Sequence, residues 1–335
     1  MAKTYADAGV DIGKIRKMQS GINSALIQTK NEYTKNFLAG HYAGTFEAGK
    51  YKMSLHCDGV GSKILVAQAL GKHDTVGIDA VAMNANDIIC IGSKPIVGVD
   101  YIAISKTDEQ LVNEILKGLV AGCKEAGIAL IGGETAILPD MIKSDTKYSN
   151  ADYDLAMTVV GISEREPITG KDIKVGNVLV GLESSGLHSN GFSLARKVLD
   201  VNTWGKEMLV PTRIYVNAIM EMIEKAQVNG IAHITGGAFS KLSRIGEHAG
   251  CGFLLDNMPQ PKGIFAQIYK KVGDERECYR TFNMGVGMVV VVPQEDAQKI
   301  ILIAKKHKIN ASIIGKATKE KSVILQKDEK KIDLL

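Results

Sequence analysis

An apolar strand that runs into a glycine corner recurs in this chain and constrains its fold more than any other feature. Residues 51–57, YKMSLHC, alternate apolar and polar side chains as a half-buried strand does, and DGVGSK follows at once. The segments IALIGGETA at 128–136 and HITGGAF at 233–239 have the same layout. Glycine lacks a Cβ atom, so backbone amides at such corners can approach a ligand closely. The pattern predicts a fold of strands and helices with ligand-binding turns at strand ends.

Composition and charge narrow the class of protein. The 335 residues allow two domains of ordinary size, and 41 Lys and Arg against 37 Asp and Glu leave a net charge of only +4. The longest apolar run, residues 284–292, is too short to span a membrane and predicts a buried strand. The five cysteines include no C-x-x-C pair, and the N-terminus shows no apolar signal segment. We therefore expect a cytoplasmic protein that binds neither nucleic acid nor a membrane.

One helix is well defined by its spacing. A strand is expected at residues 97–105, and the apolar residues of 111–123 then recur at i, i+4 and i+8. Thr107 and Gln110 form a candidate capping box for this helix. Gly127 is placed to end it.

A polar, turn-rich stretch at residues 164–176 divides the chain. We place an N-terminal domain at residues 1–165 and a C-terminal domain of alternating strands and helices at residues 166–335. A last helix and strand are expected at 294–317. The final residues, KDEKKIDLL, are expected to be loosely held.

The stretch HCDGVGSK brings together three features that a phosphate with its Mg²⁺ requires. Asp58 can supply an oxygen ligand to the metal, and Lys63 adds a positive charge nearby. Between them, Gly59 and Gly61 leave backbone amides open to an anion. A glycine turn with an exposed lysine is the alternative interpretation.

Residues 77–92 predict a helix with acidic and amide side chains. Asp87 and Asn84 share one face, whereas Asp79 and Asn86 point elsewhere. Asp79 lies near the helix start, where a capping role is common. Asp87 is surrounded by apolar residues, and a carboxylate buried there needs a partner or a bound cation. Asp87 is therefore a candidate ligand.

Glu134 follows a buried strand and adjoins glycines, as Asp58 does. Two carboxylates delivered from strand ends to one edge of a sheet would form a divalent-metal site that holds nucleotide phosphates. A catalytic carboxylate pair and a surface acid are the alternatives.

In the second half, a strand leads through small polar residues into a helix, which is typical of an anion site. This polar run contains Ser184, Ser185, Gly186, His188, Ser189 and Asn190. His188 could donate to a sugar phosphate or act as an acid or base. His233 is expected in the core or just behind the site.

Taken together, these motifs resemble one enzyme family over nearly the whole chain. The segments that carry the likeness are YADAGVDI at 5–12, DGVGSK at 58–63, GIDAVAMNANDI at 77–88, GGETA at 132–136, YDLA at 153–156, SSGLHSNGFSL at 184–194, HITGG at 233–237 and YRTFNMGVGM at 279–288. The chain is similar to the phosphoribosylformylglycinamidine cyclo-ligases, also called aminoimidazole ribonucleotide synthetases.

The resemblance implies an activity and a fold. The activity is ATP-dependent closure of formylglycinamidine ribonucleotide to 5-aminoimidazole ribonucleotide in purine biosynthesis, through an iminophosphate, with release of ADP and phosphate. The fold combines α+β and α/β domains: an N-terminal mixed sheet contributes to a β-barrel across a homodimer, and the C-terminal domain is an α/β sandwich. Residues 1–165 would bind ATP and form the dimer, and residues 166–335 would hold the substrate phosphate.

The resemblance also implies roles for single residues. Catalysis would involve Asp58, Lys63 and His188. Mg²⁺ would be bound by Asp58, Asp87 and Glu134. ATP would contact Gly59, Gly61, Ser62, Lys63, Asp79, Asn86, Gly132, Gly133 and Thr135. The substrate would contact Ser184, Ser185, Gly186, His188, Ser189 and Asn190.

Three segments depart from the family pattern. Ile137 stands where the family has an acidic residue, the glycine-rich segment before the first motif is reduced to NFLAGHYAGTF at 36–46, and AFSKLSRIG at 238–246 lacks the usual N-x-P-R. They bear on the number of metal ions, the nucleotide lid and the contacts near the substrate. The general base and the role of residues 13–35 in covering ATP stay open. Rival interpretations are thiamine monophosphate kinase, the large subunit of formylglycinamidine ribonucleotide synthetase and a nucleotide-binding scaffold without turnover.

Overall fold

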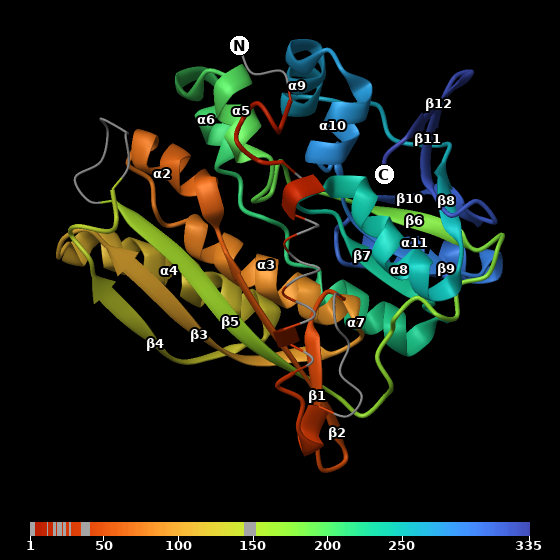
Figure 1. The fold of residues 1–335 in the computed structure, drawn as a ribbon, viewed down its shortest axis with the longest axis horizontal. Coiled ribbons are helices and arrows are strands. Elements are labelled where there is room, and N and C mark those ends of the chain that lie inside the picture. The colour runs from red at the N-terminus through yellow and green to blue at the C-terminus, as the bar shows by residue number, and fades with distance from the viewer. Residues whose placement is uncertain are drawn as a thin grey trace.

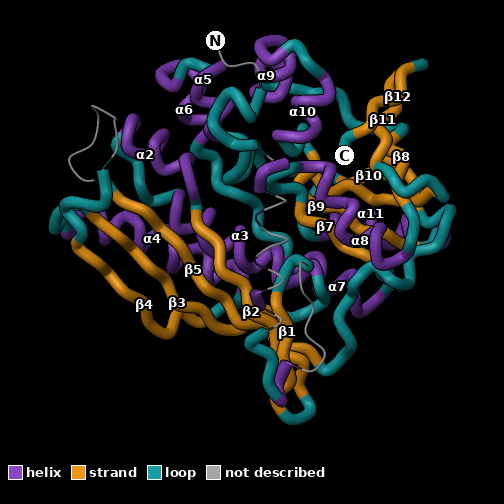
Figure 2. The backbone as a smooth tube through the Cα atoms, in the orientation of Figure 1, coloured by secondary structure: helices purple, strands orange, loops and turns teal. Residues whose placement is uncertain are grey.

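The computed structural model describes residues 4–11, 13–15, 18, 22, 25–26, 28–34, 41–143 and 152–335. Within these ranges the chain builds two separate sheets with helices around and between them (Figure 1, Figure 2). One sheet takes its strands from residues before the stretch 164–176, and the other takes its strands from residues after it. The segments 13–35 and 36–46, considered above for nucleotide covering, fall partly outside the described residues.

The N-terminal sheet has the strand order β1-β2-β5-β3-β4 and is antiparallel except for the parallel pair β3 and β4. Its strands are β1 Gly44–Ala48, β2 Tyr51–Gly59, β3 Lys94–Ile104, β4 Ala129–Ile137 and β5 Tyr153–Ser163. The strands expected from the alternating patterns at 51–57, 97–105 and 154–163 are thereby confirmed. In the described part of the chain this mixed sheet stays open, so the predicted barrel is not closed within one chain.

Among the described residues, helices cover one face of this sheet and leave the other open. Along β5 the residues alternate between buried and partly exposed, as in a sheet with one packed face. The helices of this domain are α2 Ile64–Leu70, α3 Val76–Cys90 and α4 Glu109–Ala126, with short 3-10 turns η1 Glu32–Thr34 and η2 Gly61–Lys63. The opposite face leaves apolar side chains between 40% and 66% exposed: Leu55, Val99, Tyr101 and Ile131.

Helix α4 confirms the predicted apolar stripe and its end at Gly127, which has a φ of 68°. The predicted capping box at Thr107 is wrong. The Asp108 side chain instead accepts a hydrogen bond from the backbone N–H of Leu111 at 3.0 Å. Asp108 stands directly before the first helical residue, and a carboxylate there is a strong N-cap.

Helix α3 is buried along almost its whole length. It packs against β2 and β5 on one side, and against α7 (Val216–Lys225) and β7 (Gly230–His233) on the other. A helix that is buried on all sides needs neighbours on all sides. Because α3 lies between the domains, its polar residues can reach both of them (Figure 1).

The C-terminal sheet has the order β12-β11-β8-β10-β6-β9-β7. Its strands are β6 Val178–Glu183, β7 Gly230–His233, β8 Gly252–Leu255, β9 Val286–Val292, β10 Ala311–Thr318, β11 Val323–Lys327 and β12 Lys330–Asp333. The helices are α5 Phe192–Val198, α6 Val201–Met208, α7 Val216–Lys225, α8 Ser243–Ala249, α9 Ile264–Val272, α10 Glu275–Thr281 and α11 Ala297–Lys306, with η3 Ala238–Leu242 and η4 Gln294–Asp296. Every residue of β9 is buried, which confirms the buried strand expected at 284–292.

The end of the chain is not loosely held, contrary to expectation. Strand β12 pairs with β11, and Leu334 is fully buried. The charged segment KDEKKIDLL forms part of a short hairpin whose polar residues face outward. No helix in the described ranges is both long enough and apolar enough to cross a membrane.

Candidate active site

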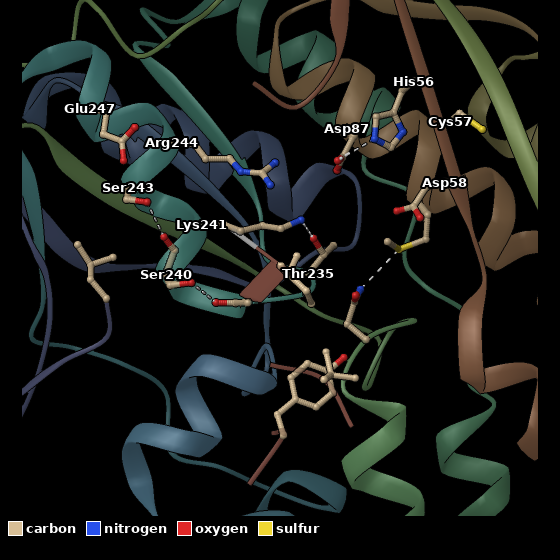
Figure 3. Close-up of a pocket in the computed structure, with 18 residues that line it drawn as sticks. His56, Cys57, Asp58, Asp87, Thr235, Ser240, Lys241, Ser243, Arg244 and Glu247 are labelled. Carbon is tan, nitrogen blue, oxygen red and sulfur yellow. Dashed lines mark hydrogen bonds and ion pairs between the residues drawn. The ribbon is translucent and has the colours of Figure 1, made fainter. Parts of the chain in front are cut away.

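A cavity of about 610 Å³ opens where the two domains meet. His56 and Asp58 from β2 and Asp87 from α3 form one wall, and the opposite wall comes from the segment 235–247 (Figure 3). Asn190 also lines the cavity. The N-terminal segment contributes Tyr5 and Val10. The volume is typical of small-molecule sites, and the mixed origin of its walls makes it a site between domains.

Asp87 is held between two histidines. The His233 Nδ1–H donates to one carboxylate oxygen at 2.7 Å, and the His56 Nε2 lies 3.3 Å from the other. Burial alone would raise the pKa of Asp87, but the charge of His56 and the hydrogen bond from His233 outweigh it and lower that pKa. Asp87 is therefore a partnered, ionised group at the cavity wall, and His233 lies behind it as expected.

His56 is oriented by Asn84. The Asn84 amide donates to the backbone carbonyls of Asp58 and Ala80, so its oxygen accepts from His56 Nδ1 at 3.0 Å. The other ring nitrogen, Nε2, faces the Asp87 carboxylate. Both ring nitrogens thus face acceptors. The shared face predicted for Asn84 and Asp87 is confirmed.

Asp58 has a carboxylate that is only partly used. One of its oxygens accepts the Gly59 N–H at 2.8 Å, and the side chain faces the cavity (Figure 3). Burial raises the pKa of Asp58, and the nearby Asp87 carboxylate raises it further, while His56 lowers it. A carboxylate with a raised pKa beside a cavity is suited to bind a cation or accept a proton.

Lys63, predicted to contact a phosphate, does not line the cavity. Its ammonium donates to Asp79 at 2.9 Å and to the carbonyls of His188 and Val210 at 3.0 and 2.8 Å. The side chain is fully buried. All three of its donor positions are occupied by protein acceptors.

Asp79 belongs to the same interior pair. Besides Lys63, it accepts the backbone N–H and the hydroxyl of Thr212 at 2.7 and 2.6 Å. It lies in the first turn of α3, which begins at Val76, so it is not the cap. Lys63 and Asp79 join η2 and α3 to the C-terminal domain.

Most of the polar run at 184–190 is also satisfied internally. The hydroxyls of Ser184 and Ser185 donate to Asn283 and to the Pro211 carbonyl, and His188 Nε2 accepts from the Ser185 N–H. His188 is fully buried, and burial lowers its pKa well below the usual range, so its ring is neutral. Of the six residues predicted to bind substrate, Asn190 lines the cavity, whereas Ser184, Ser185, Gly186, His188 and Ser189 do not.

Glu134 is not brought to Asp58. Strand pairing places Asp58, Met157, Asp100 and Gly133 in one row across the sheet, and Glu134 is the next residue along β4. Successive residues of a strand point to opposite faces, so Glu134 lies on the exposed face and Asp58 on the covered one. Three strand spacings also separate them, roughly 14 Å.

The predicted set of three metal-binding carboxylates therefore does not fit within one chain. Among the described residues no group of three His, Cys, Asp or Glu side chains is placed to hold a metal ion. Asp87 already uses both oxygens with histidines, whereas Asp58 on the same wall has room for a cation, and Glu247 lines the cavity from α8.

The remaining residues predicted to bind ATP are spread over several places. Asn86 is buried and binds the backbone at Arg213 and Tyr215. Gly132, Gly133 and Thr135 lie in β4, and Ser62 contacts the hydroxyl of Ser193. The cavity is lined by Cys57 and Asp58 but not by Gly59, Gly61, Ser62, Asn86, Gly132, Gly133 or Thr135.

The structure adds cavity residues that the motifs did not single out. Lys241 and Arg244 extend from η3 and α8 toward Asp87 and Asp58 (Figure 3). Lys241 donates to the Thr235 hydroxyl. They follow the corner at Gly237, which has a φ of 84° that favours glycine. The signal was present in the sequence: a glycine corner followed by Lys and Arg, as DGVGSK is by Lys.

Comparison with known proteins shows the family to which the chain belongs. The family models for the N-terminal and C-terminal domains of AIR synthase related proteins match residues 40–163 and 174–328. The phosphoribosylformylglycinamidine cyclo-ligase of Methanocaldococcus jannaschii is 49% identical over 331 residues, covering 93% of this chain and 91% of that protein. The chain belongs to the phosphoribosylformylglycinamidine cyclo-ligase family. The resemblance inferred from the motifs is thereby confirmed.

A second cyclo-ligase, from Pyrococcus furiosus, is 44% identical over 321 residues, with 91% of this chain and 92% of that protein covered. Among solved structures, AaThiL complexed with AMPPCP and TMP has a TM-score of 0.67 at 15% identity and covers 96% of both chains. T. maritima PurL complexed with ATP has a TM-score of 0.60 at 17% identity, covering 87% of this chain and 44% of that one. At such identities the likeness shows a shared fold alone, and the two-domain expectation is confirmed at that level.

Proposed function

We propose that this chain catalyses the ATP-dependent closure of formylglycinamidine ribonucleotide to 5-aminoimidazole ribonucleotide, with release of ADP and phosphate. The observation that carries the proposal is a sequence identity of 43–49% with cyclo-ligases such as those of Thermococcus kodakarensis and Methanocaldococcus jannaschii, over more than nine-tenths of the chain. Structures with the rival thiamine monophosphate kinase activity share only 14% identity. The five free cysteines suit a cytoplasmic setting for this pathway.

The proposed reaction has two steps. The γ-phosphoryl group of ATP is transferred to the formamide oxygen, which gives an iminophosphate and ADP. The internal amidine nitrogen then attacks the same carbon, phosphate leaves with the former formamide oxygen, and a proton is lost from nitrogen. Such chemistry depends on alignment, charge neutralisation and exclusion of water, which a cavity between two domains can provide.

Asp58 is the residue that we assign to proton transfer or cation binding at the cavity. It faces the cavity, and one of its oxygens accepts no hydrogen bond from the described residues, whereas Lys63 and His188, the other predicted catalytic groups, do not line the cavity. Its raised pKa brings it closer to neutral pH, which favours a general base. Beside it, the Asp87 carboxylate is held in place by His56 and His233.

ATP is the proposed cofactor because neighbours of the same fold were solved with ATP or AMPPCP. Mg²⁺ would accompany the nucleotide, and Asp58 is the carboxylate placed to meet it. The metal set that includes Glu134 would need a second protomer, since Glu134 lies on the other face of the sheet.

The exposed face of the N-terminal sheet supports a homodimer. Leu55, Val99, Tyr101 and Ile131 present apolar surface from three strands, and an open sheet could complete a barrel by pairing with a second copy. Tyr101→Lys should shift the protein toward monomer in analytical ultracentrifugation. An unchanged dimer, or a wild-type monomer at micromolar concentration, would contradict this part.

The activity is tested with purified protein, ATP, Mg²⁺ and formylglycinamidine ribonucleotide. The proposal predicts ADP release that depends on the ribonucleotide, together with formation of the aminoimidazole. ATP binding without turnover would support the scaffold instead. Phosphorylation of thiamine monophosphate would support the kinase.

A further inference from the structure

Two cations stand side by side on the C-terminal wall of the cavity. Lys241 lies on η3 and Arg244 follows three residues later on α8, and both line the cavity partly buried. The fully enclosed ring of Tyr42, from the N-terminal domain, lies beneath both: Lys241 Nζ is 5.8 Å and Arg244 Cζ is 5.3 Å from its centroid. Cation–π contacts at this range hold a charged group in place.

Neither cation has an ion-pair partner among the described residues. The described carboxylates that line the cavity, Asp58, Asp87 and Glu247, form no salt bridge with either cation, and Asp87 is already paired with His56 and His233. Within the described part of the chain, Lys241 donates to the Thr235 hydroxyl alone. Burial lowers the pKa of Lys241, Asp87 raises it and the adjacent Arg244 lowers it again. Two neighbouring, partly buried cations that form no salt bridge with any described residue make a site in which an anion is stabilised.

We propose that Lys241 and Arg244, seated on Tyr42, bind a phosphoryl group in the cavity. This inference rests on the proposed function for the identity of the ligand. It replaces the phosphate contact predicted for Lys63, whose ammonium is occupied inside the protein. It also gives a role to the segment AFSKLSRIG, where this chain departs from the family pattern.

The same phosphate chemistry has two sources in the proposed reaction. One is the ribose 5-phosphate of the substrate, and the other is the group transferred from ATP, which leaves as inorganic phosphate. Lys241 supplies a point charge with free donors, and Arg244 a planar fork that matches two phosphate oxygens. Both sources would therefore be held in the same manner, and kinetics can separate them.

The test measures binding of inorganic phosphate and of ribose 5-phosphate to the full chain by equilibrium dialysis. The variants are Lys241→Met, Arg244→Met and Arg244→Lys, with Lys299→Met as control because Lys299 is an exposed lysine paired with Asp296 on the surface. Loss of a charged hydrogen bond should weaken affinity for at least one of the two ligands about tenfold or more in the Met variants. Arg244→Lys should recover part of the affinity, and Lys299→Met should bind as wild type.

Kinetics then identify the source. If the Met variants raise KM for formylglycinamidine ribonucleotide alone, the site holds the ribose phosphate. If they raise KM for ATP and weaken inhibition by product phosphate, it holds the transferred group. Wild-type affinity for both ligands in both Met variants would overturn the inference even if the enzyme is active. Loss of binding in the variants of a protein that shows no cyclisation would uphold it while refuting the proposed function.

Discussion

Two lysines of this protein lie between the same two domains, yet their surroundings differ completely. Lys63 is fully buried and donates to Asp79 and to two backbone carbonyls, so its charge is spent on holding the domains together. Lys241 lines the cavity with one hydroxyl partner and no carboxylate within ion-pair distance among the described residues. A lysine in a motif that resembles a phosphate-binding loop can therefore have a structural role, while a lysine outside that motif has the charge that faces the cavity.

The largest effect expected from this comparison is on stability. Lys63→Met should lower the free energy of unfolding by about 3–5 kcal/mol, because Asp79 would remain buried without its partner. Lys241→Met should change it by less than about 1 kcal/mol, since no ion pair is broken. Urea unfolding of both variants followed by circular dichroism makes the measurement. A Lys63→Met protein as stable as wild type but unable to bind phosphate would reverse the two assignments.

The acids Asp79 and Asp58 differ in the same way: Asp79 is paired with Lys63 inside the protein, whereas Asp58 lines the cavity. Asp58→Asn should lower kcat at least about 100-fold if Asp58 moves a proton or holds the cation. Because the pKa of Asp58 is raised in the folded protein, its ionisation opposes folding above the ordinary Asp range. The same variant should therefore be more stable at neutral pH, by about 1 kcal/mol, and this gain should vanish in acid. Full activity in Asp58→Asn would remove Asp58 from the site.

A smaller effect concerns the pH dependence of stability and His188, whose backbone carbonyl accepts a hydrogen bond from Lys63. His188 is neutral in the folded protein because burial lowers its pKa, so the unfolded chain binds the extra proton. Its contribution to stability is complete above about pH 6.5 and is lost as the pH falls below that value, by about 2 kcal/mol at pH 5. His188→Gln should flatten this part of the stability profile, measured by urea unfolding between pH 5 and 8. An unchanged slope would mean that His188 is not held neutral.

Much of the fold followed from the sequence because strand alternation and helix periodicity are local. The strands β2, β3 and β5, the end of α4 and the buried β9 were predictable for that reason, and the ordered motifs identified the family. Asp58 and Asp87 do meet at the cavity, as their positions suggested.

What could not be predicted depends on which way a side chain points. Glu134 and Asp58 share a motif layout, but one residue of strand register puts Glu134 on the opposite face. The run from Ser184 to Ser189 looks like an anion site, yet the hydroxyls of Ser184 and Ser185 find acceptors in Asn283 and Pro211, which are distant in sequence. Lys241 was passed over because it lies in a segment that departs from the family motif.

A crystal structure of the protein with formylglycinamidine ribonucleotide and a non-hydrolysable ATP analogue tests the account most directly. It predicts a phosphate group within hydrogen-bonding distance of both Lys241 and Arg244, across the cavity from Asp58, with Lys63 still bound to Asp79. Phosphates contacting Lys63 or the Ser184–Ser189 run, with Lys241 and Arg244 touching none, would contradict it.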